Sequence, residues 1–246
     1  MELIHKKQFP LSHLHTDCWG RVKPSVLMFF AQEVAESHCY ELHADWDTLQ
    51  EKGLFWAVIR QKFQFSRLPA AGEVLTLETW PMPTTRVAYP RSTVAYDADG
   101  NVVFQAISLW VLMSSKTRAM IPPGKSGVDI EGVLRGTELE APGTLAPKQL
   151  ENKTVRTVRY CHLDRNGHMN NTKYLDWLDD LLPAAFHQDH PLREVTVCYL
   201  SEALENEQIA LNWELSETGD LAVEALREGT DVPIRHHRVF SVRAVY

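Results

Sequence analysis

Residues 161–177 read CHLDRNGHMNNTKYLDW, and they place polar side chains capable of acid–base chemistry directly before an apolar pattern of helical spacing. Asp164, Asn166 and His168 alternate along this segment. A carboxylate or an imidazole can activate water or a nucleophile, and Glu202, expected on a strand after the helix, would add a general base. The combination predicts acyl transfer or hydrolysis, in which a carbonyl oxygen becomes an oxyanion.

The helix that follows the segment would supply the second part of that chemistry. Asn170 or Asn171 is a suitable N-cap, because a short polar side chain accepts a hydrogen bond from the first free amides of a helix. Free backbone N–H groups and the positive end of the helix dipole also favour an oxyanion there. The pattern therefore predicts that the carbonyl to be attacked lies at this helix start.

Two other interpretations of the segment stay open. Asp and Asn before a helix are most often caps, and a single histidine near a turn is most often structural. His162, Asp164 and His168 also have the side chains of metal ligands, but no H-E-x-x-H pattern or Cys/His pairing accompanies them. The sequence contains no G-x-S-x-G, G-x-G-x-x-G or P-loop pattern, which disfavours serine hydrolases and nucleotide-binding enzymes. We expect no metal and no cofactor.

An internal repeat helps to separate scaffold from chemistry. Three residue types recur 147 positions apart, as His15 and His162, Asp17 and Asp164, and Gly20 and Gly167. Further along, positions correspond at a separation of 134, as Phe63 and Val197, Phe65 and Tyr199, and Glu73 and Glu207. The chain therefore reads as a tandem duplication, in which fold-determining residues should persist in both copies.

The two copies differ at the polar segment. The first copy has Trp19 opposite Asn166, Arg21 opposite His168, Lys23 opposite Asn170 and Leu68 opposite Glu202. The second copy alone should therefore be catalytic. Asp164 keeps a counterpart in Asp17, so its role is expected to be partly structural.

Each copy predicts a helix followed by strands, and the helix of the second copy is expected at 170–186. In the first, a helix is expected at 25–40 with Pro24 at its entry, and Met28, Phe29 and Phe30 make it apolar on nearly all sides, which suits an acyl chain lying along it. Alternating apolar residues indicate strands in both copies. We expect those strands at 58–68, 73–80, 92–114, 194–204, 207–215, 221–226 and 235–245.

Proline and glycine are concentrated between the copies. We assign residues 1–128 to a non-catalytic N-terminal domain, 129–150 to a linker and 151–246 to a catalytic C-terminal domain.

The composition limits the kinds of partner and the cellular compartment that we expect. The chain has 246 residues and a formal charge of −7, which argues against nucleic acid as a partner because phosphate binding requires a basic excess. No apolar stretch approaches the roughly 18 to 20 residues of a membrane-spanning helix. The four cysteines have no close spacings, which fits reduced thiols. These features predict a cytoplasmic protein without a membrane span.

The motif LDRNGHMNNTKYLDW, followed about thirty residues later by CYLSEALENE, resembles the acyl-acyl carrier protein thioesterases. HTDCWGRVKPSVLMFFAQEVAESH and WVLMSSKTRAMIPP in the first half resemble the same family, so the likeness covers nearly the whole chain. It implies an α+β fold, a tandem double hotdog in which each half has a long central helix wrapped by a curved antiparallel β-sheet.

The resemblance implies that Asp164, Asn166, His168 and Glu202 form the catalytic set. Many plant relatives carry a cysteine after the acidic residue, and Ala203 stands there in this chain. Attack by water is therefore expected, with Glu202 as base, since a thiol nucleophile at that position is absent. Backbone N–H groups at the helix start would stabilise the oxyanion; the residues expected there are Gly167, Met169 and Asn170.

The resemblance further implies that the acyl group arrives on an acyl carrier protein, an acidic partner that needs a local basic patch. Candidates for that patch are Lys62, Arg67, Lys116, Arg118 and Lys125. Three alternatives stay open: a thioesterase acting on coenzyme A esters, a hotdog hydratase and a non-catalytic acyl-binding protein. Two hotdogs in one chain are compatible with either a monomer or a homodimer.

Overall fold

The computed structural model describes residues 3–229 and 237–246. The chain divides into two compact units, Met1–Pro142 and Gly143–Tyr246. The division falls inside the segment 129–150, where the sequence predicts a linker. The first two residues of the strand expected at 235–245 lie outside the described part of the chain.

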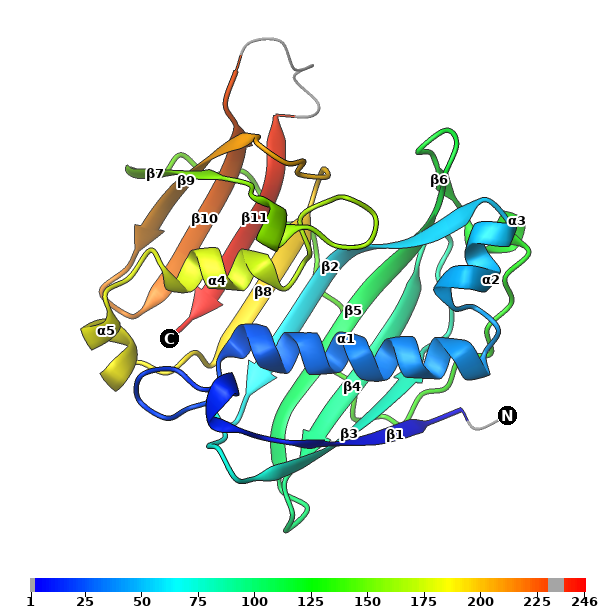
Figure 1. Cartoon of the computed structure of the whole chain (residues 1–246), viewed down its shortest axis with the longest axis horizontal. Helices are drawn as coiled ribbons and strands as arrows, with labels where there is room; N and C mark the ends of the chain where they lie inside the picture. Colours follow the sequence, from blue (N-terminus) through cyan, green and yellow to red (C-terminus); the bar gives the residue numbers. More distant parts are fainter. Residues whose placement is uncertain (1–2, 230–236) are drawn as a thin grey trace. The chain divides into compact units, whose positions relative to one another are not determined.

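The first unit is an antiparallel sheet with a long helix across it (Figure 1). Neighbouring strands follow the order β1-β3-β4-β5-β2, and β6 pairs with β5. The strands are β1 His5–Pro10, β2 Leu54–Phe65, β3 Val74–Pro81, β4 Tyr89–Tyr96, β5 Val102–Ser114 and β6 Met120–Ile121. The helical elements are η1 His13–His15, α1 Pro24–Glu41, α2 Trp46–Glu51 and α3 Pro123–Ser126.

The second unit repeats this arrangement. Its strands follow the order β7-β9-β10-β11-β8, again with antiparallel pairing between neighbours. They are β7 Asn152–Thr157, β8 Glu194–Tyr199, β9 Gln208–Leu215, β10 Asp220–Arg227 and β11 Arg238–Val245. The helical elements are η2 Tyr160–His162, α4 Lys173–Asp179 and α5 Ala184–Asp189.

The second unit matches the first in the order of its five main strands and in the helices between the first two of them, which gives the tandem double hotdog. Elements β6 and α3 have no counterpart among the described residues of the second unit. Strands β1 and β7 begin 147 positions apart, as do η1 and η2. Neither edge strand is predicted from the sequence, because each carries few apolar residues and is recognised only by its pairing, β1 with β3 and β7 with β9.

Helix α1 forms where the sequence predicts it. Pro24 lies in the first turn, where a missing N–H costs nothing, and the helix runs for 18 residues. Its apolar face is buried, and Phe30 stacks on Phe9 of β1 with ring centroids 4.6 Å apart. Beside that contact, Lys7 of β1 forms an ion pair with Glu33 at 2.8 Å. The helix is therefore fixed to its sheet by apolar and ionic contacts together.

The second central helix is shorter than predicted. Helix α4 has seven residues, and a turn containing Pro183 separates it from α5. Proline has no N–H to donate and its ring clashes with the preceding turn, so a continuous helix over 170–186 cannot form. Tyr174 nevertheless anchors α4 to the sheet, with its ring 4.5 Å from that of Phe240 and 5.3 Å from that of Tyr199.

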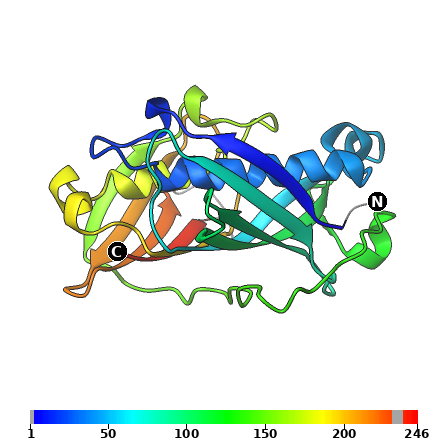
Figure 2. The ribbon, with the colours of Figure 1, turned by 90° about the horizontal axis from the view of Figure 1, so that it is seen from below.

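The segment after α3 is an ordered strap on the first unit, although the sequence assigns most of it to a linker. Val128 and Ile130 join a core cluster, and the Val133 amide donates to the Pro81 carbonyl at 2.9 Å. Arg135 lies over the Trp80 ring at 4.8 Å. Seen from the side, this strap follows the sheet face opposite α1 (Figure 2).

Candidate active site

The loop that carries the candidate residues has the same hydrogen bonds in both units. Asp164 Oδ1 accepts from the amides of Asn166 at 2.8 Å and His168 at 3.2 Å. In the first unit Asp17 Oδ1 accepts from the amides two and four residues later, at 2.8 Å and 3.0 Å. The aspartate therefore shapes the loop whether or not the loop carries chemistry, as the repeat suggests.

The amides expected to stabilise an oxyanion are already donating. Gly167 N–H bonds to the Asp164 carbonyl at 3.0 Å, and Met169 N–H to the Ala203 carbonyl at 2.9 Å. Asn170 N–H bonds to the carbonyl of His162 at 2.8 Å. The first unit repeats all three bonds, with donors Gly20, Val22 and Lys23. These bonds count against an oxyanion role for Gly167, Met169 and Asn170.

Gly167 and Asn170 have clear structural functions instead. Gly167 has φ of 77°, a left-handed conformation that only glycine adopts freely, and Gly20 has 78° at the equivalent turn. The Asn170 side chain accepts from the Thr172 amide at 2.9 Å and from its hydroxyl at 2.7 Å. Asn170 thus forms the turn before α4, while the N-cap position itself is Thr172.

His168 and Glu202 are brought together. His168 Nε2 lies 3.4 Å from Glu202 Oε2, and their side chains are 14% and 41% exposed. A β-bridge between His168 and Leu204 brings the two segments side by side. Glu202 lies in the loop after β8 and not on the strand, in contrast to the sequence expectation. An imidazole beside an exposed carboxylate can exchange a proton with water.

At the equivalent positions of the first unit, which the structure describes, there is no His–Glu pair. Arg21 takes the place of His168, and it turns back to Asp17, with Nη2 3.3 Å from Oδ2. Leu68 takes the place of Glu202. The β-bridge between Arg21 and Ala70 still holds the two segments together, so the scaffold is kept while the acid–base groups are missing.

Asn166 is at the tip of the loop. It is exposed, and its side-chain amide has no hydrogen-bond partner within the described residues. Its backbone is fixed by Asp164 and by the neighbouring Gly167 turn. The amide is therefore held at a defined place from which it can bind a ligand oxygen.

Cysteine takes no part in this arrangement. Ala203 is buried, and its carbonyl accepts from Met169. Cys198 is buried on β8, with Sγ 3.7 Å from the Gly143 carbonyl. A buried thiol bonded within its own unit is poorly placed as a nucleophile.

The acyl-chain residues predicted on α1 point in different directions. Met28 and Phe30 are buried, whereas Phe29 is 50% exposed. Only the first two can line an internal apolar space. Phe30 is already packed against Phe9 and, edge-on, against His15.

Sequence reasoning missed two residues that interact with the site. Arg227, at the end of β10, donates to the Glu202 carbonyl. Tyr174 of α4 is buried, and that burial raises the pKa of its hydroxyl far above the usual value. Nothing in the local sequence marks either residue, because strand ends are usually solvated and helix tyrosines usually belong to the core.

Within the described residues, no group of three or more His, Cys, Asp or Glu side chains is arranged to hold a metal ion. Over the same part of the chain, no helix has the length and apolar character needed to cross a membrane.

Curated proteins of similar sequence are acyl carrier protein thioesterases of plants. The chain is 26% identical over 218 residues to a chloroplastic palmitoyl-acyl carrier protein thioesterase of Gossypium hirsutum, covering 81% of this chain and 52% of that protein. It is 24% identical over 212 residues to oleoyl-acyl carrier protein thioesterase 1 of Arabidopsis thaliana, covering 76% and 58%. The chain thus spans about half the length of the curated relatives it matches.

Solved structures agree on the fold. An acyl-ACP thioesterase from Bacteroides thetaiotaomicron superimposes with a TM-score of 0.87 at 23% identity, covering 98% of this chain and 97% of that one. The 12:0-ACP thioesterase from Umbellularia californica gives 0.82 at 20% identity, covering 100% and 97%. Both likenesses extend over both units, which confirms the tandem double hotdog.

Family models match each unit separately. The acyl-ACP thioesterase N-terminal domain matches residues 2–122 and the acyl-ACP thioesterase C-terminal domain matches residues 146–232. Together they cover most of the chain in the order in which the two units occur. The chain belongs to the acyl-ACP thioesterase family.

Proposed function

We propose that this protein hydrolyses the thioester of a fatty acyl-acyl carrier protein and releases a free fatty acid. The observation that carries the proposal is the His168–Glu202 pair, 3.4 Å apart in the second unit and absent from the otherwise equivalent loops of the first. The family and the names of its relatives supply the substrate class. In this proposal the first unit is non-catalytic.

The reaction needs a base, an oxyanion donor and a proton for the leaving thiolate. Glu202 accepts a proton from water as the water oxygen bonds to the thioester carbonyl carbon. The Asn166 amide, held at the loop tip, donates to the resulting oxyanion, and Asp164 keeps the loop in shape. As the C–S bond breaks, His168 passes the proton from Glu202 to the departing sulfur, so an acid and a thiol are formed.

The thiols support a reducing compartment. All four cysteines are free, and Cys18 and Cys161 are exposed. Exposed thiols persist where disulfides do not form, which supports the cytoplasm as the place of action.

The test is steady-state release of fatty acid from matched acyl-carrier-protein and acyl-coenzyme A substrates. Glu202→Gln should lower turnover by about 10²–10⁴-fold, the usual contribution of a general base. Glu205→Gln, which removes an exposed charge three residues away, is the matched control and should leave turnover within about twofold of the parent.

Other outcomes are decisive in the opposite direction. A loss below about threefold in Glu202→Gln would remove this carboxylate from the base role. Faster hydrolysis of the coenzyme A ester would identify a coenzyme A thioesterase. No release from either substrate by folded protein would favour acyl binding or hydration.

A further inference from the structure

Arg227 is a buried cation that converges on the loop carrying Glu202. It ends strand β10, and its side chain is 8% exposed. Its Nε lies 2.9 Å from Glu207 Oε1, and Nη1 lies 3.4 Å from the Ser201 hydroxyl. Nη2 donates to the main-chain carbonyl of Glu202 itself. One guanidinium therefore contacts the residue before Glu202, Glu202 itself and the far end of the loop.

The contacts of Glu207 connect Arg227 to more of the loop. Its Oε2 accepts from the Leu204 amide at 3.0 Å, and Leu204 forms the β-bridge to His168. The amide of Met169 bonds to the carbonyl of Ala203 between them. Arg227, Glu207 and Leu204 thus connect both members of the His168–Glu202 pair to the end of β10.

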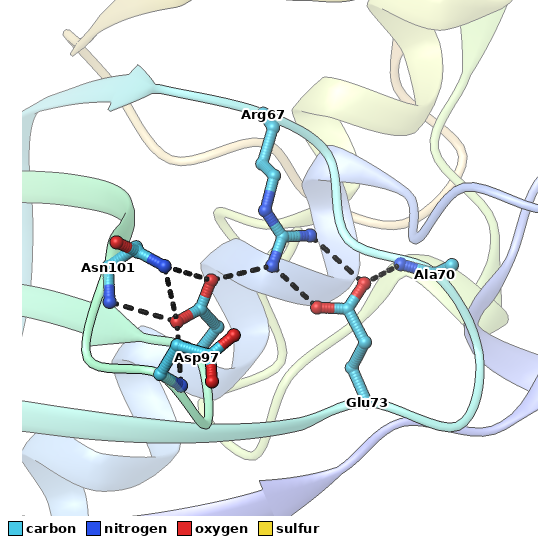
Figure 3. A network of polar contacts seen from close by, with 6 residues as sticks. Arg67, Ala70, Glu73, Asp97 and Asn101 are labelled. Atoms are coloured by element: carbon cyan, nitrogen blue, oxygen red, sulfur yellow. Dashed lines mark hydrogen bonds and ion pairs between the residues drawn. The ribbon is translucent and has the colours of Figure 1, made fainter.

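The first unit solves the same structural problem with the arginine in another place (Figure 3). There the arginine, Arg67, belongs to the loop itself. It forms ion pairs with Glu73 at 2.6 Å and with Asp97 at 3.1 Å. Glu73 in turn accepts from the Ala70 amide at 2.7 Å, the counterpart of the Leu204 bond.

Strand register identifies the equivalent positions. Thr76 pairs with Tyr96 in the first unit, and Ala210 pairs with Leu226 in the second. Since Thr76 corresponds to Ala210, Asp97 corresponds to Arg227. At the separation of 134 positions, Arg67 corresponds to Ser201 and Glu73 to Glu207. The glutamate is retained, while the arginine has exchanged sides between the loop and the strand end.

The exchange matters for Glu202. In the first unit the long Arg67 side chain occupies the position directly before Leu68. The second unit has the small Ser201 there, and its cation is Arg227 at the end of β10. From β10, the guanidinium holds the Glu202 backbone and leaves its carboxylate beside His168. We propose that Arg227 is a positioning residue that fixes Glu202 for catalysis, an inference that rests on the proposed hydrolysis.

The first experiment is a double-mutant cycle on acyl-carrier-protein hydrolysis with Arg227→Gln, Glu202→Gln and both together. Displacing a reacting group by about 1 Å can cost about 10²-fold in rate, so Arg227→Gln should lower kcat by that order with KM nearly unchanged. If Arg227 acts through Glu202, the double variant should be no slower than Glu202→Gln. Fully additive losses would overturn the inference.

Asp97→Asn is the matched control, because Asp97 stands in the first unit at the position of Arg227, and asparagine can still accept from the Asn101 amide. It should leave kcat within about twofold of the parent, whereas Arg227→Lys should recover part of the lost kcat by retaining one charge with fewer donors. Equal effects of Asp97→Asn and Arg227→Gln on kcat would mean that Arg227 has only a structural role.

Amide hydrogen exchange provides a readout independent of activity. Arg227→Gln should reduce protection at Leu204 and Met169, the two amides that hold the Glu202 loop, while Asp97→Asn should not. Unchanged protection at both amides would overturn the inference even in an active enzyme. An inactive parent that loses protection in Arg227→Gln would refute the proposed hydrolysis and leave the loop-fixing role intact.

Discussion

The carboxylates of Asp164 and Asp17 shape their loops in the same way, each accepting from the amides two and four residues further on. The two residues separate a folding role from the proposed catalytic one, because only the loop of Asp164 also carries Asn166 and His168. Since a half-buried amide left without an acceptor is costly, loss of the bonds from His168 and Arg21 should destabilise the two loops.

We therefore expect Asp164→Ala and Asp17→Ala to lower the free energy of unfolding by similar amounts, about 1–3 kcal/mol each. Only Asp164→Ala should also reduce kcat. Urea denaturation and hydrolysis assays measure the two effects. A large loss of kcat in Asp164→Ala with unchanged stability would contradict a loop-shaping role.

His162 should make the free energy of unfolding depend on pH. Its burial, followed by the nearby Lys173 charge, lowers the pKa of its ring, and neutral Nδ1 accepts from the Arg159 amide at 3.0 Å. Because the unfolded chain takes up this proton first as pH falls, stability should decline from about pH 6.5 and level off below the folded pKa.

The prediction is tested with His162→Asn, whose side-chain oxygen can still accept from Arg159. The difference in free energy of unfolding between parent and variant should change as the pH falls below about 6.5 and stay constant above pH 7. A pH-independent difference would show that His162 is not the titrating group.

The structure brings Asp164, His168 and Glu202 close together, and the amides that the sequence assigns to an oxyanion donate to main-chain carbonyls. The amides of Gly167 and Met169 were expected to be free because a helix was expected to begin beside them, but α4 begins at Lys173 and the loop uses those amides itself. Arg227 was missed because its partners become neighbours only when β10 pairs in register with β9.

At the scale of elements, the strap after α3 is the main departure from the expected linker. Its irregular backbone shows no periodicity, so composition alone suggested a flexible connection. In the fold, Glu138 accepts from Trp80 Nε1 at 3.1 Å, and Arg135 forms an ion pair with Glu78. Strands β3 and β5 were predictable from alternation, whereas such side-chain contacts across 57 positions were not.

At Gly132 the strap passes close to the backbone that follows β3. A Cβ there would overlap the backbone of Met82 and Pro83. Gly132→Ala should therefore lower the free energy of unfolding by about 1–3 kcal/mol through overpacking. Gly124→Ala, where a Cβ meets nothing within 4 Å, is the control. A thermal midpoint equal to that of the parent in Gly132→Ala would mean that the strap yields without cost.

At the scale of the whole molecule, charge is the property that bears on substrate delivery. The chain carries a formal charge of −7, so an acidic carrier protein would meet net repulsion outside any basic patch. Of the five basic candidates, Arg67 is ion-paired and Arg118 lies over the Phe55 ring at 4.8 Å, while Lys116 and Lys125 are exposed.

Added salt should therefore lower kcat/KM for an acyl-carrier-protein substrate, by about tenfold between 0.05 M and 0.5 M, because screening weakens attraction between the exposed charges. A small acyl thioester should respond by less than about twofold over the same range. Parallel salt curves for both substrates would show that carrier docking is not electrostatic.

Because the loop is repeated, the polar side chains of the second unit could be introduced into the first. Asp17, Gly20 and both β-bridges already reproduce the frame in which His168 and Glu202 stand. Trp19→Asn, Arg21→His and Leu68→Glu, together with Arg67→Ser and Asp97→Arg, would place the polar set of the second unit on the first. Asp97→Arg would also remove the acceptor of the Asp99 and Asn101 amides. The first unit thus keeps the frame of the loop and differs from the second at these five side chains.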